Sequence, residues 1–226
     1  MSALGDAADL APFIRQYFPR IAIASSFSLE DALVMAWGVE VEPSVRVIAL
    51  DTGRLPEETF EVAEALRQRL GVRIEWFAPN TGQVERLERD KGLYSFRSSL
   101  AERHECCRIR KVDPLRRALV GVDAWVTGQR RLHGVTRSKL EVVETPATGP
   151  IKINPLAHWT LEEVRREVAR RGLPYHRLYD RGFTSIGCAP CTRAVAAGED
   201  ERAGRWWWEG AEHKECGLHN RQGEAK

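Results

Sequence analysis

The chain has 226 residues, enough for one large domain or one domain with a tail. Hydrophobic residues make up 43% and charged residues 29%, the balance of an ordinary globular protein. A net charge of +2 does not indicate a nucleic-acid-binding surface, and no apolar stretch approaches the roughly 20 residues that span a membrane. Residues 1–13 contain two aspartates and no basic residue, unlike a signal peptide, so we expect a cytoplasmic protein.

Strand-like and helix-like segments alternate through the first two thirds of the chain. Short apolar runs predict strands at 20–25, 44–50, 72–77, 123–127 and 151–154, and apolar residues at helical spacing predict helices at 29–37 and 56–70. This order is typical of an α/β fold, a doubly wound and mostly parallel sheet with helices on both faces.

Further helix boundaries are indicated by capping patterns. Asp113 before Pro114 predicts an N-cap followed by proline at the first helical position. Thr160 begins the pattern of a capping box, and Gly172 ends the helix that follows. Helical periodicity fades after Pro174, so we expect a loop-rich C-terminal segment.

Two polar loops follow the first two predicted strands. Residues 25–31, with the sequence SSFSLED, lack the pattern of a glycine-rich phosphate loop but offer serine hydroxyls and a helix N-terminus to an anion. Residues 50–54, LDTGR, follow the second strand. Either loop alone is also an ordinary turn. Because ligands of open α/β sheets bind at the carboxyl ends of strands, the two loops together favour a nucleotide site at this edge.

Four of the five cysteines form two close pairs, Cys106-Cys107 and Cys188 with Cys191. Four thiolates suit a tetrahedral zinc ion or an iron–sulfur cluster. Adjacent side chains diverge, so the first pair favours a 4Fe-4S cluster over zinc. The first pair could instead be buried apolar residues, although its charged surroundings argue against that, and the second could be a redox dithiol.

Basic residues and a fifth cysteine complete the pattern. Lys111 lies four residues after Cys107, where one helical turn would bring it to the cysteine side to stabilise a cluster or bind an anion, unless it belongs to a solvated basic face. Arg202 and Arg205 have the forked geometry that suits phosphate and sulfate. Cys216 has basic neighbours that favour a nucleophilic thiolate, although a lone cysteine near a terminus is more often a bystander.

In combination these motifs resemble those of the assimilatory adenylylsulfate reductases, within the adenylylsulfate/phosphoadenylylsulfate reductase family, from about residue 21 to residue 219. The resemblance is carried by SSFSLED (25–31), LDTG (50–53), CCRIRKVDPL (106–115), TGQRR (127–131), TR (136–137), IGCAPCT (186–192), RWWWE (205–209) and KECGLH (214–219). It implies an adenine-nucleotide α-hydrolase-like, Rossmann-like fold. It also implies thioredoxin-dependent reduction of adenylylsulfate to sulfite and AMP, a step of sulfate assimilation toward cysteine.

The resemblance further implies a role for individual residues. Cys216 would attack the sulfur and form an S-sulfonate that thioredoxin reduces. One 4Fe-4S cluster, without a redox role, would be held by Cys106, Cys107, Cys188 and Cys191. The substrate would contact Ser25, Ser26, Phe27, Ser28, Asp31, Leu50, Thr52, Lys111, Gly128, Arg137, Arg202, Arg205 and His219. Residues 1–198 would form the reductase domain with the iron–sulfur site, and residues 199–226 a mobile segment carrying the catalytic cysteine.

One stretch departs from the family, and other functions remain open. Residues 132–135, LHGV, stand where the family commonly has Asp-Gln-Ser before Thr-Arg. The family's substrate contacts therefore cannot be carried over to this stretch, and a changed substrate range is an open alternative. The cysteine pairs favour adenylylsulfate over its 3′-phosphorylated form, although a dual-substrate enzyme is an alternative. One rival function is a tRNA sulfur-transfer ligase, but such enzymes carry a Ser-Gly-Gly-x-Asp-Ser loop that this chain lacks. Another is a metal- or cluster-binding redox sensor, which would leave Cys216 without a function. We expect no nucleic acid or membrane partner, and the sequence is compatible with a homo-oligomer.

Overall fold

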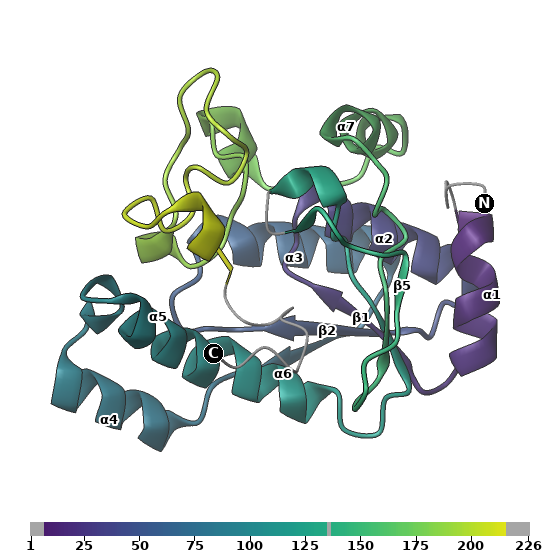
Figure 1. Ribbon diagram of the computed structural model, residues 1–226. Coiled ribbons are helices and arrows are strands. Elements are labelled where there is room, and N and C mark those ends of the chain that lie inside the picture. Colours follow the sequence, from purple (N-terminus) through teal and green to yellow (C-terminus); the bar gives the residue numbers. More distant parts are fainter. Residues whose placement is uncertain (1–6, 135–136, 216–226) are drawn as a thin grey trace.

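Six strands form one sheet in the order β3-β2-β1-β4-β6-β5 (Figure 1). The computed structural model describes residues 7–134 and 137–215. The strands are β1 (Ile21–Ser25), β2 (Arg46–Leu50), β3 (Ile74–Phe77), β4 (Ala124–Val126), β5 (Val143–Glu144) and β6 (Ile151–Ile153). Every neighbouring pair is parallel except β5 with β6. The five predicted strands and the mostly parallel sheet are confirmed, and β5 is an addition too short for a periodicity to reveal.

Helices cover both faces of this sheet, as predicted. They are α1 (Ala7–Tyr17), α2 (Leu29–Val41), α3 (Glu57–Leu70), α4 (Thr81–Lys91), α5 (Leu100–Cys107), α6 (Asp113–Ala118) and α7 (Leu161–Arg170). On one side lie α2, α3 and α7, with α1 beside α2, and on the other lie α4, α5 and α6 (Figure 1). Within the described residues, no helix combines the length and apolarity that crossing a membrane requires.

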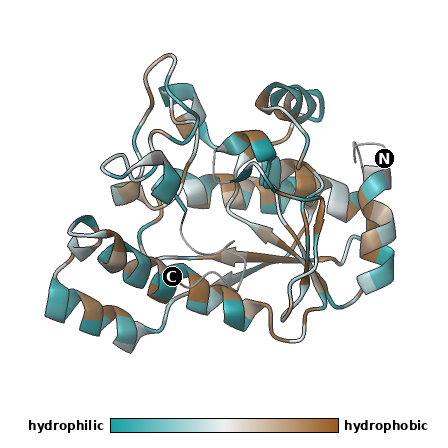
Figure 2. Ribbon diagram, in the orientation of Figure 1, coloured by the Kyte–Doolittle hydropathy of each residue, from teal (hydrophilic) through white to brown (hydrophobic). Residues whose placement is uncertain are grey.

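The core follows from the two-residue period of the strands. Ile23 and Val47, which are paired in register, pack on the side of α2 and α3, whereas Ala22 and Ile48 pack with Leu115 of α6. Because both faces are covered, the central strands are apolar throughout, which Figure 2 shows as brown arrows between partly hydrophilic helices. This explains why continuous apolar runs predicted them.

The prediction that Asp113 is an N-cap is wrong, although α6 is assigned from Asp113 onward. Helix α5 continues through a π-helical turn, Arg108–Val112 (the π-turn), directly into α6. Asp113 itself has helical φ and ψ of −65° and −42°, and its N–H bonds to the carbonyl of Arg108 five residues earlier. The wider turn accommodates the ring of Pro114 and its missing N–H inside a continuous helix, so the proline does not mark a start.

The other capping prediction is confirmed. The Thr160 hydroxyl accepts a hydrogen bond from the N–H of Glu163, and the Glu163 carboxylate accepts one from the N–H of Thr160. Gly172 follows α7 with a φ of +58°, a left-handed conformation that glycine adopts without strain. Beyond it, the described residues form turns and short 3₁₀ helices, the loop-rich segment that the sequence predicted.

Candidate active site

A cavity of about 180 Å³ lies where the strand order changes direction. Strand β1 lies between β2 and β4, and ligands of open α/β sheets bind beyond the carboxyl ends of strands at such a point. The predicted substrate contacts within the described residues all line this nucleotide cavity: Ser25, Ser26, Phe27, Ser28, Asp31, Leu50, Thr52, Lys111, Gly128, Arg137, Arg202 and Arg205. Their contact with a substrate stays a prediction, and His219 and Cys216 lie outside the described residues.

Asp31 fixes the shape of the loop after β1. One carboxylate oxygen accepts from the Ser26 N–H and hydroxyl at 2.6 and 2.7 Å, and the other accepts from the Gly128 N–H at 3.2 Å. Burial raises the pKa of Asp31, while the hydrogen bonds from Ser26 act in the opposite direction. A Cβ at Gly128 would lie 2.6 Å from an Asp31 oxygen, so a glycine is required for the loops after β1 and β4 to meet.

The loop after β2 connects the nucleotide cavity to the cysteines. The carbonyl of Thr52 accepts a hydrogen bond from Arg110 at 2.7 Å, and its hydroxyl is hydrogen-bonded to the Cys188 sulfur at 3.3 Å. Glu88 of α4 binds Arg110 at 2.5 Å and Arg54 at 2.9 Å. The π-turn and the β2 loop are therefore held together by charged hydrogen bonds next to the thiols.

The four cysteines of the two pairs are buried around one small cavity of about 20 Å³, the cysteine cavity. Five cations share its lining, namely Arg54, Arg103, Arg110, Lys111 and Arg205. Burial raises the pKa of Cys188, but Lys111 and the Thr52 hydroxyl outweigh burial and hold that pKa below its ordinary value. Burial and the neighbouring Cys188 raise the pKa of Cys191 to about 11.

This cavity can be tested against the groups that four thiols bind. Among the residues that the structure describes, no three His, Cys, Asp or Glu side chains are arranged to hold a single metal ion. Four thiols that line one cavity among cations supply the sulfur ligands and the positive surroundings that a negatively charged iron–sulfur cluster needs. The cluster nevertheless stays a prediction.

Arginines form one wall of the nucleotide cavity. Arg137 donates to the Glu215 carboxylate at 2.9 Å, and Arg202 lies 3.5 Å from the same carboxylate. Arg205 donates to the carbonyl of Ile186 at 3.2 Å. A Cβ at Gly187 would lie 2.4 Å from the Arg205 guanidinium, so this glycine lets Arg205 approach the chain. Two predicted anion-binding arginines thus contact the carboxylate that precedes Cys216.

The sequence did not reveal how Arg103 of α5 holds the segment after residue 199. Its fully buried guanidinium donates to the Glu209 carboxylate at 2.7 Å and to the carbonyls of Glu215 and His213 at 2.7 and 2.6 Å. It also stacks 4.5 Å from the ring centre of the buried Trp206. Trp206, the first tryptophan of the WWW run, therefore packs on the main domain. The mobility of residues 199–226 stays a prediction.

Arg130 is a second buried arginine without a clear signal in the sequence. It donates to Glu30 of α2 and to Glu201, each at 2.7 Å. Its position in the TGQRR motif indicated importance, but nothing identified its partners, since they lie 100 and 71 residues away. Arg130 therefore joins α2, the helix that follows β1, to the segment that carries Arg202.

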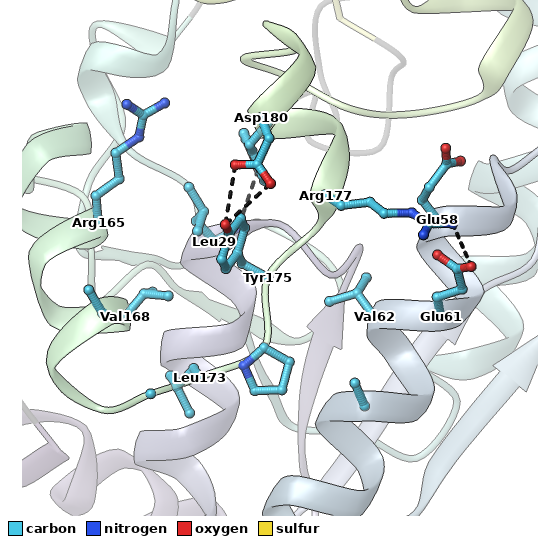
Figure 3. A pocket seen from close by; sticks show the side chains of 15 residues that line it. Leu29, Glu58, Glu61, Val62, Arg165, Val168, Leu173, Tyr175, Arg177 and Asp180 are labelled. Atoms are coloured by element: carbon cyan, nitrogen blue, oxygen red, sulfur yellow. Dashed lines mark hydrogen bonds and ion pairs between the residues drawn. The ribbon is translucent and has the colours of Figure 1, made fainter.

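A larger cavity, of about 820 Å³, opens between α3 and α7 (Figure 3). Its floor is apolar, with Val62 and Leu173, and its rim carries the Arg177–Glu61 ion pair. It contains none of the predicted substrate contacts or cysteines. Among the described residues, only Tyr179 lines both cavities, so the nucleotide cavity remains the candidate site.

Comparison with known sequences agrees with this geometry. The family model described as phosphoadenosine phosphosulfate reductase domain matches residues 20–194. The adenosine 5'-phosphosulfate reductase of Allochromatium vinosum is 46% identical over 203 residues, which cover 89% of this chain and 79% of that protein. The proteins of the same name from Burkholderia cepacia and Neisseria meningitidis are 46% and 45% identical, covering 88% and 87% of this chain and 80% of each relative.

Comparison with solved structures confirms the predicted fold. A phosphoadenylyl-sulfate reductase from Candida auris, in a phosphate complex, matches with a TM-score of 0.69 at 23% identity, over 84% of this chain and 90% of that chain. The FMN adenylyltransferase of Candida glabrata, in complex with FAD and pyrophosphate, matches with a TM-score of 0.59 at 15% identity, over 84% and 64% of the two chains. At these identities the likeness concerns the fold alone.

Proposed function

Because the chain belongs to the family of phosphoadenosine phosphosulfate reductase domains, we propose that this oxidoreductase converts adenylylsulfate to sulfite and AMP. The names of its relatives support adenylylsulfate as the substrate. The reductant would be thioredoxin, in the cytoplasm, and the sulfite would serve sulfate assimilation.

One observation carries the proposal: Glu215, which lines the nucleotide cavity, directly precedes Cys216. The described part of the chain thus ends at the arginine wall of the cavity, one residue before Cys216 in the sequence. Arg137 and Arg202, which bind the Glu215 carboxylate, offer donors to an anion that takes its place. The nucleophile and the anion site are thereby neighbours in the chain.

In the proposed reaction the Cys216 thiolate attacks the sulfur of adenylylsulfate. A sulfur–sulfur bond forms while the bond between sulfur and the bridging oxygen breaks, and AMP leaves with that bonding electron pair. One thiolate of thioredoxin then attacks the Cys216 sulfur and releases sulfite. Its second thiol resolves the mixed disulfide, so the dithiol is oxidised and Cys216 is restored. The arginine wall lowers the repulsion between the thiolate and the anionic oxygens.

The four cysteines around the cysteine cavity, Cys106, Cys107, Cys188 and Cys191, would hold one 4Fe-4S cluster. When bound, the cluster would supply a structural tie and an electrostatic environment, without exchanging electrons with the substrate. Lys111 lines both the cysteine cavity and the nucleotide cavity, so its ammonium can favour an anion on either side. Removal of the bound iron is expected to loosen the π-turn that carries Lys111.

The proposal is tested by the half-reaction in the absence of reductant. The protein, purified without oxygen and with its iron content measured, is incubated with adenylylsulfate and analysed by mass spectrometry. We expect one SO₃ group on the peptide that contains Cys216, together with release of AMP. The matched control is Cys216→Ser, which should bind iron equally well and gain no adduct.

Two other outcomes would point elsewhere. An adduct formed faster from the 3′-phosphorylated substrate would assign the chain to phosphoadenylylsulfate reduction. No adduct from either nucleotide, in protein whose iron is fully loaded, would contradict the reductase and favour a redox sensor. A sensor also requires Cys216→Ser to leave the protein's iron-dependent response unchanged.

A further inference from the structure

The stretch that departs from the family pattern lies at the arginine wall of the nucleotide cavity. Leu132 points to solvent with 64% of its surface exposed, whereas His133 lines the cavity. A Cβ at Gly134 would lie 2.7 Å from the Cδ atom of Arg202, so this glycine allows Arg202 to pack over the chain. The departure therefore brings an imidazole ring into the cavity beside the predicted anion-binding residues.

The contact with Arg137 assigns the tautomer of His133. The guanidinium of Arg137 lies 3.4 Å from Nδ1 of His133. A guanidinium donates hydrogen bonds and accepts none, so Nδ1 must be the unprotonated nitrogen and the ring proton resides on Nε2. The Nε2 atom is buried and has no hydrogen-bond partner among the described residues. A buried donor without an acceptor is rare in native proteins and is stabilised when an acceptor arrives.

The surrounding charges keep this ring neutral and attract an anion. Burial, followed by the charges of Arg137, Arg202, Arg130 and Arg205, holds the pKa of His133 well below its ordinary value. The Glu215 carboxylate on the same wall is bound by Arg137. His133 is thus a neutral N–H donor in a positive environment, whose missing partner is an acceptor such as an anionic oxygen.

We propose that the Nε2–H group of His133 donates a hydrogen bond to an oxygen of the substrate's phosphosulfate group, which makes His133 an additional binding residue for that anion. The inference rests on the proposed function, because it takes adenylylsulfate as the ligand. It gives a role to the stretch in which this chain differs from its family: the imidazole supplies a neutral donor next to the arginine forks.

The test measures binding in the Cys216→Ser background, where the substrate cannot react. Calorimetry compares adenylylsulfate with adenosine, which lacks the anionic group, for chains carrying His133→Leu, His133→Gln and the exposed-residue control Leu132→Ala. We expect His133→Leu to weaken adenylylsulfate binding about tenfold, which is the effect of losing one hydrogen bond to a charged acceptor. Adenosine binding should stay unchanged. His133→Gln retains an N–H donor and should stay within about threefold, and Leu132→Ala should bind like the parent.

The outcomes separate this inference from the function on which it rests. Equal weakening of adenosine and adenylylsulfate by His133→Leu would mean a structural role and overturn the inference, as would unchanged adenylylsulfate binding. In both cases the Cys216→Ser parent still binds adenylylsulfate and the proposed function stands. If that parent, loaded with iron, binds no adenylylsulfate, the proposed substrate and the inference fail together.

Discussion

Glu215 holds the same arginines that a substrate anion needs. Its carboxylate is bound by Arg137 and lies near Arg202, so adenylylsulfate must displace it before binding. Replacing Glu215 by glutamine removes the competing charge while keeping the shape of the side chain. We expect the KM for adenylylsulfate to fall by about three- to tenfold, equivalent to roughly 1 kcal/mol. Steady-state kinetics measure this, with the exposed Glu212→Gln as control, and an increased KM would show that Glu215 assists binding.

His176 makes the stability of the fold depend on pH. Its Nδ1 accepts from the Leu178 N–H at 3.3 Å, so its Nε2–H donates to the Thr59 hydroxyl at 3.0 Å. Burial lowers the pKa of His176 to about 4. Because the unfolded chain binds this proton more readily, the stabilisation is present above the unfolded pKa near 6.5 and is lost as the pH falls toward the folded value.

The expected loss between pH of about 7 and about 5 is roughly 2 kcal/mol in the free energy of unfolding. Urea denaturation at the two pH values measures it. His176→Gln should be less stable at neutral pH but lose roughly 2 kcal/mol less on acidification than the parent chain. His158→Gln, on the exposed surface, serves as the control and should keep the parental pH dependence. An identical pH dependence in His176→Gln would contradict the assignment.

At the level of single residues, the sequence predicted those that occur in short local motifs. Ser28 and Asp31 could be predicted because a loop between a strand and a helix N-terminus has a local signature. Arg103 and Arg130 could not, because an arginine in a charged run is usually solvated, and their partners are up to 112 residues away. Burial of a charge depends on distant carboxylates and carbonyls that periodicity does not register.

Helix α4 stabilises the π-turn through one carboxylate. Glu88 pairs with Arg54 and with Arg110, whose side chain is only 4% exposed. Glu88→Ala would leave a buried cation unpaired, which costs several kcal/mol when both partners are buried. Because Glu88 is partly exposed, we expect the free energy of unfolding of Glu88→Ala to fall by about 2 kcal/mol. The matched control is Glu85→Ala on the exposed face of α4, with an expected change near zero.

Thermal unfolding and bound iron are the measurements for this pair of variants. Glu88→Ala should melt lower and retain less iron, because the π-turn follows Cys107 directly. Equal iron content and equal melting in the two variants would show that the Arg110 contact with the Thr52 carbonyl suffices alone.

At the level of elements, buried strands were predictable and the π-turn was not. Strands of a covered parallel sheet are apolar on both faces, so a short continuous run identifies them. A π-turn has no periodicity of its own, and Pro114, which follows it in α6, suggested an N-cap that the continuous helix does not have. Strand β5 has two residues and exists through its pairing with β6, which is a tertiary contact.

Across the whole molecule, Arg103 joins α5 to the segment that ends at Glu215. Arg103→Ala removes the interactions of this side chain with Glu209, His213, Glu215 and Trp206 of that segment. We expect the free energy of opening of residues 205–215 to fall by about 3 kcal/mol, with the sheet unchanged. Hydrogen exchange resolved by peptide measures both regions.

Lys91→Ala is the control for this variant, since Lys91 binds Glu102 and Glu105 of α5 at the surface and should matter little. Loss of turnover in Arg103→Ala should accompany the faster exchange of residues 205–215. Unchanged exchange there would mean that Arg202 and its bond to the Lys214 carbonyl hold the segment instead.

The doubly wound architecture was predictable at this scale because the order of strands and helices restricts it to few topologies. The packing of residues 199–215 against α5 was not, since it depends on contacts between segments about a hundred residues apart. Local sequence patterns therefore specify the fold, whereas the site also depends on contacts between segments that are far apart in the sequence.

The separation of the two cysteine pairs in the sequence also determines when each pair emerges from the ribosome. Cys188 follows Cys107 by about 80 residues, and Arg205 of the cysteine cavity comes later still. At ribosomal rates of about 5–20 residues per second, the first pair emerges roughly 4–16 s before the second. During that interval two thiols are exposed without the rest of their cavity. Any group that needs all four can therefore be inserted only after the second pair has emerged.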